Sequence, residues 1–583
     1  MVKQFVRYSL NTAALMAVCV SSSVWSATLN VVVEGVEGEL KENVEGFLSI
    51  EALNGEEIKS LSRVRYLHRQ AEDDIRSALE PFGYYEPSIE TSLEEKGDQW
   101  VATYRVTAGT PVTYSTVDLA IDGAANDDPE FQRLMNTSEI RVGQVVLHSQ
   151  YDTFKSRLMS LAAERGYHEA QVAKSQVRVD LESYSASADL KFESGPRYRI
   201  GEIHFSDSPL SEKLLYRYLP FEEGEPVRTS QLVDVQTALL DSDYFKRVEV
   251  RPAWENATGE EVPIEIQLEP QKRTRYEAGL GYGTDTGARI KLGVTRRWVN
   301  SLGHQMSGDL QLSEITNLAA LEYTIPGKDP LKERYAINLN YEDENSDTVE
   351  SETFGIGVSR QRQLREWQLV TALQYEEETY TLDGETTSST LLYPMFSMST
   401  VSAENRLNVK NGYRLTAQIK GGSDALLSDT NFVQLYGNAK WIHSLTDQTR
   451  VLARVEAGLT AAGDFDKIPA SHRFYAGGDS SVRGYAYQSL GPKGDDGDVI
   501  GGPNLLVASL EADYRFTGSD WGVAAFIDAG NAYEDASINL KTGVGVGVRW
   551  FSPIGPVRLD LAVPQADDAD DSFRIHFTLG ADL

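Results

Sequence analysis

The stretch that decides the fold is YEAGLGYG, Tyr276 to Gly283. Its bulky or apolar residues occupy every second position, and glycine fills most of the positions between them. A period of two is that of a β-strand with two unlike faces. The same alternation recurs up to the last residues, Phe573 to Leu583. From Arg273 onward the sequence therefore predicts strands rather than helices.

About sixteen such segments, with turn residues between them, can be placed from Arg273 to Leu583. An even number of strands, each with one apolar face, is typical of a membrane β-barrel. A large soluble sandwich or propeller is the alternative, but no repeating blade motif is visible. We therefore expect residues 271–583 to form a 16-stranded antiparallel transmembrane β-barrel.

The region before the barrel contains a repeat that mixes helices and strands. The segments GQVVLHSQY from Gly143 and GEPVRTSQL from Gly224 share one pattern, start 81 residues apart, and each leads into a helical period. Tyr84, Tyr167 and Tyr244, which follow the three helices, lie 83 and 77 residues apart. Gly-Pro turns separate the units. The sequence predicts three α+β domains, at residues 27–109, 110–195 and 196–270.

The first 26 residues have the pattern of a secretory signal peptide. Lys3 and Arg7 precede a short apolar run, and Val24 and Ser26 are small enough for a cleavage site. The sequence has one cysteine, Cys19, within this segment, so we expect an exported chain without disulfides. The formal net charge of -32 argues against nucleic acid as a partner.

The stretch AGGDSSVRGYAYQSLGP, Ala476 to Pro492, resembles a surface loop but carries Arg483. By strand count it connects the eleventh and twelfth strands. A solvated loop tip is the default interpretation. Alternatively the loop folds into the lumen, where a guanidinium needs carboxylate partners. Glu511 and Asp528 lie among apolar residues on the next two strands, and an acid facing lipid is costly, so both are expected to point inward.

A glycine face on a nearby strand favours the second interpretation. Gly543, Gly545 and Gly547 alternate with valines. If the valines face lipid, the glycines leave space in the lumen for another segment. The sequence therefore predicts a loop that folds back into the barrel.

Together these motifs resemble the barrel of the BamA/TamA superfamily. The resemblance rests on Ala476-Gly477-Gly478, on Val482-Arg483-Gly484-Tyr485, on Ser509-Leu510-Glu511 and on Phe526 to Gly530. The repeats resemble its polypeptide-transport-associated (POTRA) domains, of βααββ order, and three of them before sixteen strands resemble the TamA branch. The resemblance implies that Val482, Arg483, Gly484 and Tyr485 form a lumenal loop latch whose partners are Glu511 and Asp528.

The resemblance also implies a function and a location. TamA-like proteins help to insert or secrete outer-membrane β-barrel proteins such as autotransporters. The implied partners are a TamB-type inner-membrane-anchored protein at the POTRA domains, unfolded outer-membrane protein clients and outer-membrane lipid. The implied location is the outer membrane of a Gram-negative-type bacterium, with the POTRA domains in the periplasm.

The route for clients would be a weak seam between the first and last strands. Glycine-rich strands pair weakly and can slip in register. Simple clearance of the lumen is the other explanation for these glycines. The seam residues proposed on this basis are Gly279, Gly281, Gly283, Phe577, Leu579 and Gly580.

No pattern in the sequence indicates an enzyme. The eight histidines are scattered, without a metal-binding H-E-x-x-H motif or cysteine ligands. Gly478-Asp479-Ser480 lacks the second glycine of a nucleophile elbow. Asp495, Asp496 and Asp498 fit a solvated acidic loop better than a calcium site. We therefore expect no catalysis, cofactor or metal. The runner-up function is a two-partner secretion transporter that passes an exoprotein through the lumen.

Overall fold

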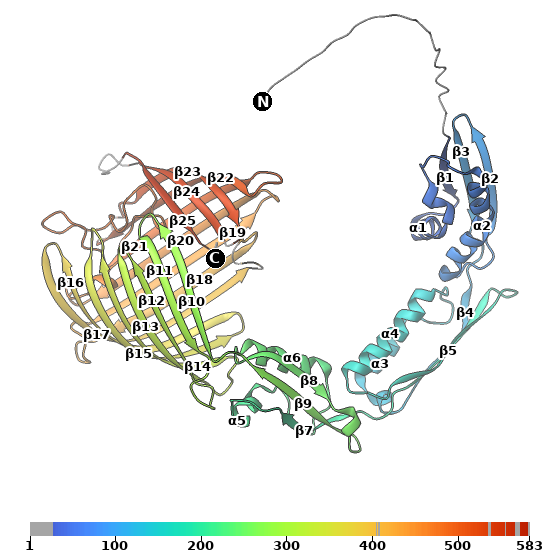
Figure 1. The fold of residues 1–583 in the computed structure, drawn as a ribbon, viewed down its shortest axis with the longest axis horizontal. Helices are drawn as coiled ribbons and strands as arrows, with labels where there is room; N and C mark the ends of the chain where they lie inside the picture. Colours follow the sequence, from blue (N-terminus) through green and yellow to red (C-terminus); the bar gives the residue numbers. More distant parts are fainter. Residues whose placement is uncertain are drawn as a thin grey trace, which may run out of the picture. The chain divides into compact units, whose positions relative to one another are not determined.

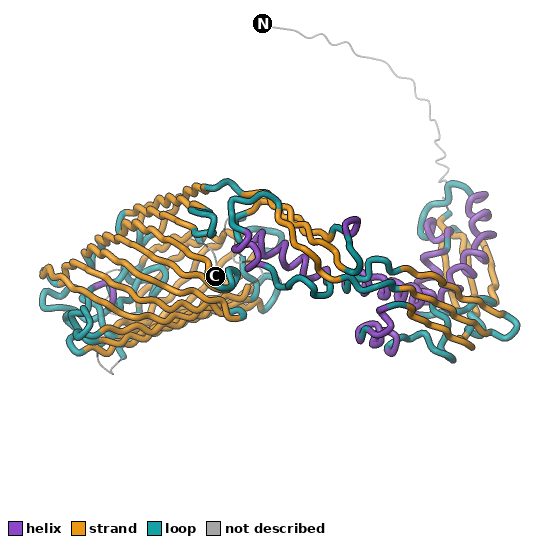
Figure 2. The backbone as a smooth tube through the Cα atoms, turned by 90° about the horizontal axis from the view of Figure 1, so that it is seen from below, coloured by secondary structure: helices purple, strands orange, loops and turns teal. Residues whose placement is uncertain are grey.

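The computed structural model of the chain describes residues 27–403, 405, 408–534, 538–553, 555–565 and 572–580. The predicted signal peptide, residues 1–26, and the end of the last alternating segment, Ala581 to Leu583, lie outside the described residues. Figures 1 and 2 show small mixed domains followed by a wall of long slanted strands. Among the described residues, no helix is both long and apolar enough to cross a membrane.

The first two small domains have the βααββ order predicted from the repeats. In each, the first strand pairs in parallel with the last strand, which lies in the middle of a three-stranded sheet. Domain one contains β1 (Thr28–Glu34), α1 (Gly38–Phe47), η1 (Ser49–Leu53), α2 (Leu61–Leu79), η2 (Glu80–Phe82), β2 (Ser88–Lys96) and β3 (Gln99–Thr107). Domain two contains β4 (Thr113–Asp122), η3 (Ala124–Asp127), α3 (Pro129–Asn136), α4 (His148–Glu164), β5 (Gln171–Asp180) and β6 (Ser185–Glu193).

The third domain repeats the same order of elements. Its sheet has the order β7-β9-β8, with β8 antiparallel to β9. It contains β7 (Arg199–Phe205), α5 (Glu212–Leu215), η4 (Tyr216–Tyr218), α6 (Thr229–Asp241), β8 (Phe245–Pro252), η5 (Trp254–Asn256) and β9 (Glu261–Pro270).

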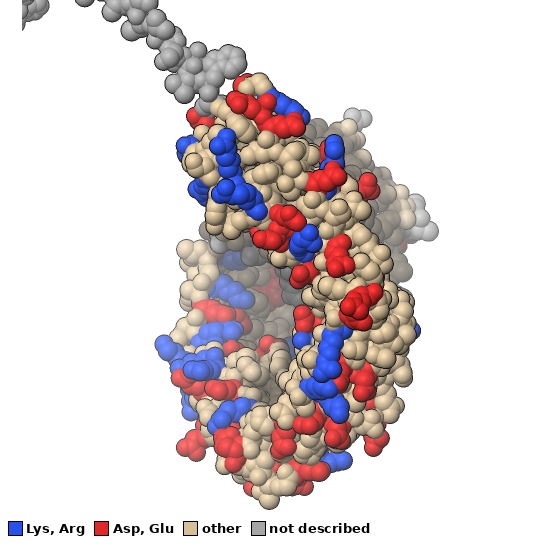
Figure 3. Space-filling model, turned by 90° about the vertical axis from the view of Figure 1, so that its right-hand side faces the viewer, with Lys and Arg blue, Asp and Glu red and all other residues tan. Residues whose placement is uncertain are grey.

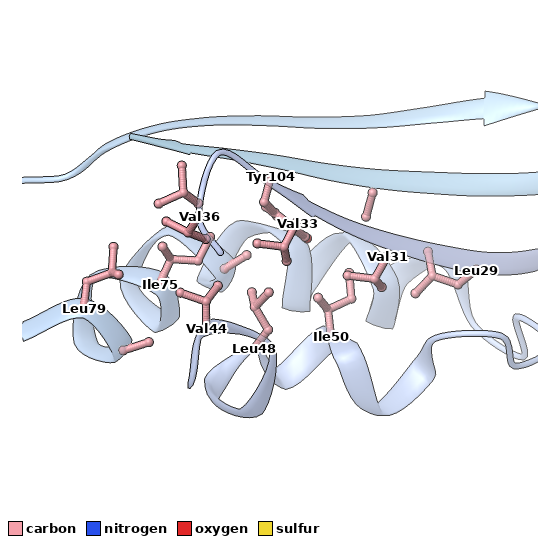
Figure 4. Packing of buried hydrophobic residues seen from close by; sticks show 14 of the residues in the cluster. Leu29, Val31, Val33, Val36, Val44, Leu48, Ile50, Ile75, Leu79 and Tyr104 are labelled. Carbon is pink, nitrogen blue, oxygen red and sulfur yellow. The ribbon is translucent and has the colours of Figure 1, made fainter. Parts of the chain in front are cut away.

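The core of domain one shows why these residues form this unit. Helix α2 begins after Ser60, whose side chain accepts a hydrogen bond from the Arg63 N–H group and so caps the helix. The buried residues of α2 recur at helical spacing, and those of β3 recur at every second position. Figure 4 shows the two sets meeting between sheet and helices.

The described chain divides into two compact units. One contains the first two domains and short parts of the third, and the other contains most of the third domain together with the barrel. Within the second unit the third domain is tied to the barrel. The Tyr244 hydroxyl donates to the Gly303 carbonyl, the Arg297 Nε lies 2.9 Å from an Asp243 carboxylate oxygen, and Arg217 donates to the Pro326 carbonyl. These contacts fix the third domain against the turns at one end of the barrel strands.

The barrel is one 16-stranded antiparallel sheet in which each strand pairs with the next. The predicted fold class is confirmed. The first eight strands are β10 (Thr274–Gly283), β11 (Gly287–Arg296), β12 (Gln305–Ser313), β13 (Thr316–Pro326), β14 (Glu333–Asn345), β15 (Glu350–Leu364), β16 (Trp367–Leu382) and β17 (Glu385–Ala403). The last eight are β18 (Gly412–Gly422), β19 (Phe432–Ser444), β20 (Thr449–Ala462), β21 (Asn504–Arg515), β22 (Trp521–Tyr533), β23 (Lys541–Ser552), β24 (Gly555–Pro564) and β25 (Arg574–Leu579).

The outer face of this sheet is apolar although the sequence as a whole is not. On β22, exposed Trp521, Val523 and Ile527 alternate with buried residues, and rows of exposed apolar side chains continue on the neighbouring strands. The mean hydropathy of the chain is only -0.35, because strand alternation averages each apolar face with a polar one. On the face drawn in Figure 3, acidic and basic side chains are interspersed.

The second domain depends on one buried carboxylate, Asp128. It caps α3 by accepting from the Glu130 N–H, and it also accepts from Arg165 Nε at 2.9 Å and from the Tyr167 hydroxyl at 3.0 Å. Arg197 lies 3.4 Å away. Burial alone would raise the pKa of the Asp128 carboxyl, but these hydrogen bonds outweigh burial and hold the pKa below its usual range. One side chain thus joins α3, the end of α4 and the start of the third domain.

We predict that Asp128→Asn destabilises the second domain by about 2 kcal/mol, because it leaves Arg165 and Arg197 without their carboxylate. In the unchanged chain, this stabilisation is present at neutral pH and is lost as the pH falls below about 4. Hydrogen exchange of the α4 amides measures both effects. Asp127→Asn, at an exposed neighbour, is the matched control. Equal exchange in the two variants would contradict this role of Asp128.

Candidate functional site

The connection between β20 and β21, residues 463–503, folds into the barrel. It forms paired bridges within itself, between Phe474 and Gly502 and between Ala476 and Leu490. Its side chains Val482 and Tyr485 pack in an apolar cluster with residues at the start of β21 and with Ala532 of β22. We call this connection the long loop. It is therefore a packed element and not a solvated loop tip.

The structure brings Arg483 of this loop together with both carboxylates that the sequence singled out. Arg483 and Asp528 form a bidentate pair, with Nε to Oδ2 at 2.7 Å and Nη2 to Oδ1 at 3.0 Å. The Arg483 Nη1 lies 2.7 Å from Glu511 Oε2. The guanidinium also stacks on the ring of Phe526, 3.4 Å from its centroid. All four side chains are buried.

A second arginine and a third acid complete the network, and the sequence argument missed both. Asp560 of β24 accepts from Arg483 Nη1 at 3.0 Å and also pairs with Arg549 of β23. Arg549 is 1% exposed and donates to Glu511 Oε1 at 2.7 Å. Three carboxylates therefore share two guanidinium groups. Arg454 of β20 adds a third cation close by, and its guanidinium donates to the carbonyls of Ser480 and Ser481.

The glycine face of β23 makes room for this network, as the sequence predicts. A Cβ atom on Gly543 would lie 1.9 Å from the Arg483 carbonyl oxygen, and one on Gly547 would lie 1.9 Å from an Asp560 carboxylate oxygen. Gly543 pairs with Asp528 across the strands, so the backbone of the long loop rests on the wall beside the carboxylate that binds its arginine. Side chains at these positions would push the loop away.

Each residue of the Val482–Tyr485 motif has its own contact. The Gly484 N–H donates to His576 Nε2 at 3.1 Å, which ties the long loop to the last strand, β25. Gly484 has φ of +99°, a conformation that favours glycine, and its Cα faces the Val563–Pro564 backbone. The Tyr485 hydroxyl donates to the Thr542 carbonyl at 3.4 Å. The motif thus contacts strands β22 to β25.

The long loop also binds a second part of the wall. Ser471 donates its backbone N–H to Glu378 Oε1 at 3.1 Å, and its hydroxyl contacts the other carboxylate oxygen. His472 Nε2 lies 2.7 Å from Glu376 Oε2, and the His472 ring packs edge-on against Tyr393. Glu376 and Glu378 belong to β16 and Tyr393 to β17. One loop therefore joins two separate groups of strands.

The first and last strands share no ladder of paired residues within the described chain; the sheet simply begins at β10 and ends at β25. They meet at Thr284, just after β10. Its N–H lies 3.3 Å from the Phe577 carbonyl oxygen, and its hydroxyl accepts from the Phe577 N–H at 2.5 Å. The rings of Tyr282 and Phe577 lie 5.9 Å apart. We call this junction the seam.

Exposure along β10 reports the open edge. Tyr276 and Leu280 are 79% and 83% exposed, whereas Ile290 and Leu292 on the next strand are 47% and 46% exposed. Among the described residues, no strand forms a ladder with β10 on the side away from β11.

The seam glycines predicted from the sequence line this region on one face of β10. A Cβ on Gly279 would meet only the Lys291 side chain at 3.9 Å, whereas one on Gly281 would lie 3.3 Å from the Arg289 guanidinium. Gly283 lies beside Thr286 and Asp479. On the other strand, Leu579 ends β25, and Gly580 donates its N–H to the Pro556 carbonyl at 3.4 Å.

Two family models match this sequence. An Omp85 superfamily domain matches residues 300–583, and a POTRA domain, TamA domain 1, matches residues 30–108. The chain belongs to the Omp85 superfamily. The resemblance to the BamA/TamA superfamily is thus confirmed.

Two curated relatives of this Omp85 chain carry the same description. The outer membrane protein assembly factor BamA of Nitratidesulfovibrio vulgaris is 23% identical over 396 residues, which cover 63% of this chain and 49% of the relative. The BamA of Neisseria meningitidis serogroup B is 21% identical over 570 residues, which cover 85% and 70%. The match to the first relative thus spans about half of its length.

A solved structure supports the fold. The crystal structure of BamA from Haemophilus ducreyi lacking POTRA domains 1-3 superposes with a TM-score of 0.69 at 19% identity, over 80% of this chain and 99% of that one. Membership of the superfamily places the barrel in the outer membrane and the POTRA domains in the periplasm. The β10–β11 turn and the long loop, both at the end of β10 away from the third domain, then lie toward the outside of the cell.

The missed partners carried a signal in the sequence. Asp560 lies between Leu559 and Leu561, just as Asp528 lies between two apolar residues of its strand. Arg549 occupies the next inward position of β23 after Gly543, Gly545 and Gly547. His576 lies within the last alternating segment, where the sequence argument considered only the pairing of the strand. Within the described ranges, no three His, Cys, Asp or Glu side chains are placed to hold a metal ion.

We predict that Gly543→Ala loosens the long loop, because its Cβ would overlap the Arg483 carbonyl oxygen. Overpacking of this kind costs about 1–3 kcal/mol, so trypsin should cut after Arg483 about tenfold faster in the folded barrel. The matched control is Gly437→Ala on β19, where a Cβ would have only the Thr416 carbonyl at 3.9 Å. The change in gel mobility on heating, which a folded barrel shows, verifies that both variants fold. Equal cleavage of both variants would show that the loop does not rest on Gly543.

Proposed function

We propose that this chain is an outer-membrane assembly factor of the TamA type. It inserts or secretes β-barrel proteins such as autotransporters through the seam between β10 and β25. Its unfolded clients arrive from the periplasm, and a TamB-type protein anchored in the inner membrane acts at the POTRA domains. The observation that carries the proposal is that, among the described residues, β10 and β25 form no ladder and meet through Thr284, Tyr282 and Phe577.

The open edge supports a role in templating strands. Backbone N–H and C=O groups of an unpaired strand bind an incoming strand by continuing the sheet. In most barrels closure removes every such edge, because the first and last strands pair along their length. Here β10 has no ladder partner on one side among the described residues, next to lipid-facing residues such as Tyr276 and Leu280. A client strand added there is already at the membrane.

The long loop supports the same function by holding one side of the seam. The Arg483 network joins β21, β22, β23 and β24, and Gly484 joins β25. We propose that Val482–Tyr485, with Glu511 and Asp528, act as a latch that keeps the last strands rigid. The flexible side of the seam is then β10, whose glycines Gly279, Gly281 and Gly283 weaken its pairing.

The assignment to the TamA type rests on the first domain. Residues 30–108 match the model for TamA domain 1, and the curated relatives are named as outer membrane protein assembly factors. We propose domain limits at residues 27–109, 110–195, 196–270 and 271–583. These names and matches favour an assembly factor over an enzyme, and they support unfolded outer-membrane proteins as clients. We propose outer-membrane lipid as a further partner.

We predict that a cross-link between β10 and β25 stops client insertion. Tyr282→Cys and Phe577→Cys place thiols where the two rings lie 5.9 Å apart, within reach of a reversible bis-methanethiosulfonate reagent. The chain is reconstituted in liposomes, and protease-protected folding of a small autotransporter barrel is followed. We expect the cross-linked chain to lose at least about tenfold in insertion rate, since strand addition needs the free edge.

The control is the same variant after the reagent has been removed with dithiothreitol, which should restore insertion. A cross-linked chain that inserts clients at the rate of the reduced chain would refute insertion through the seam. If, in addition, an unfolded exoprotein crosses the liposome membrane through the cross-linked barrel, the transporter function becomes the better description.

A further inference from the structure

Asp285 lies where three elements of the seam meet. It occupies the turn between β10 and β11, directly after Thr284, which contacts Phe577 of the last strand. Its carboxylate is buried although it belongs to a short hairpin turn. One of its oxygens accepts a hydrogen bond from the backbone N–H of Asp479 in the long loop. A buried carboxylate in a turn requires such partners.

The long loop is shaped to reach this carboxylate. Gly478 has φ of +104°, and a Cβ there would lie 2.4 Å from Asp285 Oδ2. The loop backbone therefore sits directly on the Asp285 side chain. This contact also brings the side chain of Asp479 next to that of Asp285, so two carboxyl groups share one partly enclosed space. Two adjacent ionised carboxylates repel, whereas a pair that shares one proton attracts.

The last strand contributes His576 to the same place. Its Nε2 accepts from the Gly484 N–H, which leaves the hydrogen of the neutral ring on Nδ1. The Nδ1 atom lies 3.9 Å from Asp285 Oδ1 and has no hydrogen-bond partner among the described residues. Because its ring hydrogen lies near the Asp285 carboxylate, His576 adds an attraction between the last strand and the first hairpin.

The other charged groups around the pair are few. Arg454 of β20 faces Asp479 and opposes protonation of its carboxyl, and the Tyr487 ring of the long loop lies against Gly478. The His576 ring also lies within the electrostatic influence of Arg483, Asp560 and Arg574. Burial, followed by the charge of Asp285, raises the pKa of Asp479 to about 7. Asp479 therefore changes its charge near neutral pH.

We propose that the Asp479 carboxyl takes up a proton and donates a hydrogen bond to the Asp285 carboxylate, which fastens the long loop to the first hairpin beside His576 of the last strand, so that the outer end of the seam closes more tightly as the pH outside the cell falls. The link is a regulatory contact of the seam. An effect of this link on client entry rests on the proposed function. The existence of the link does not.

The direction of the pH effect follows from the raised pKa of Asp479 in the docked loop. A released Asp479 has an ordinary carboxyl pKa, so docking takes up a proton between that value and about 7. The docked state is therefore favoured below neutral pH and weakened as the pH rises through about 7. Between about pH 8 and about pH 5.5 the docking equilibrium should strengthen by at least about tenfold.

The test is hydrogen exchange of the full chain in liposomes at these two pH values. The readout is the protection factor of peptides covering residues 476–487, corrected for the intrinsic exchange rate at each pH. These peptides contain the Asp479 and Gly484 N–H groups that bind Asp285 and His576. We expect protection to fall about tenfold from the lower to the higher pH, because local opening sets the exchange rate.

Two variants test whether the proton on Asp479 causes the pH dependence. In Asp479→Asn the amide donates a hydrogen bond to Asp285 at both pH values, so protection should stay high and lose its pH dependence. Asp498→Asn removes the same charge from an exposed position of the same loop and should behave like the unchanged chain. Equal protection of the unchanged chain at both pH values would overturn the proposal. So would a normal pH dependence in Asp479→Asn.

The insertion assay, run at both pH values, tests the link to client entry. We expect the unchanged chain to insert clients more slowly at the lower pH and Asp479→Asn to insert slowly at both. If insertion by the unchanged chain is independent of pH while the protection changes, the regulatory role is wrong. If no client is inserted under any condition, the proposed function fails, but the exchange result still decides whether the proton link exists.

Discussion

The rest of the barrel depends on how the charge of Arg483 is neutralised. A guanidinium buried inside a membrane-embedded barrel is stable only with carboxylates at hydrogen-bonding distance. Asp528 on β22, Glu511 on β21 and Asp560 on β24 supply them from the inward face of the wall, and Arg549 on β23 balances part of their negative charge. Since each acid is bound to an arginine, the long loop cannot leave without exposing unpaired charges. The position of the loop, the glycine face of β23 and the contact with the last strand all follow from this arrangement.

The sequence predicts most of this fold because strand alternation is a direct physical signal. Every strand between Arg273 and Leu579 must present an apolar face to lipid, so inward acids such as Asp528 and Glu511 stand out from their neighbours. The glycines at 543, 545 and 547 likewise indicate that another segment needs their space. The helical periods and the recurring tyrosines define the three periplasmic domains. In each case the pattern is local and repeats many times.

The features that the sequence did not predict depend on contacts between distant residues. Asp560 and Arg549 have the same local pattern as other inward residues, and only the three-dimensional register brings them to Arg483. The junction of Asp285, Asp479 and His576 joins a turn, a loop and the last strand, which lie far apart in the sequence. The same holds for Ser471 and His472 against β16, because the path of the long loop across the lumen leaves no periodic signal in its residues.

The attachment of the third domain to the barrel has a mechanical consequence. Tyr244 contacts Gly303 and Asp243 contacts Arg297, and both Gly303 and Arg297 lie in the connection between β11 and β12, next to the strand that pairs with β10. A force applied to the third domain is therefore transmitted to β11 and β10. The Arg483 network stabilises the other side of the seam. The two sides of the seam are thus supported differently: the Arg483 network holds the last strands, and the third domain is attached beside the first. A displacement of the third domain would therefore act first on the strands next to β10, whereas the Arg483 network holds β21 to β24 together.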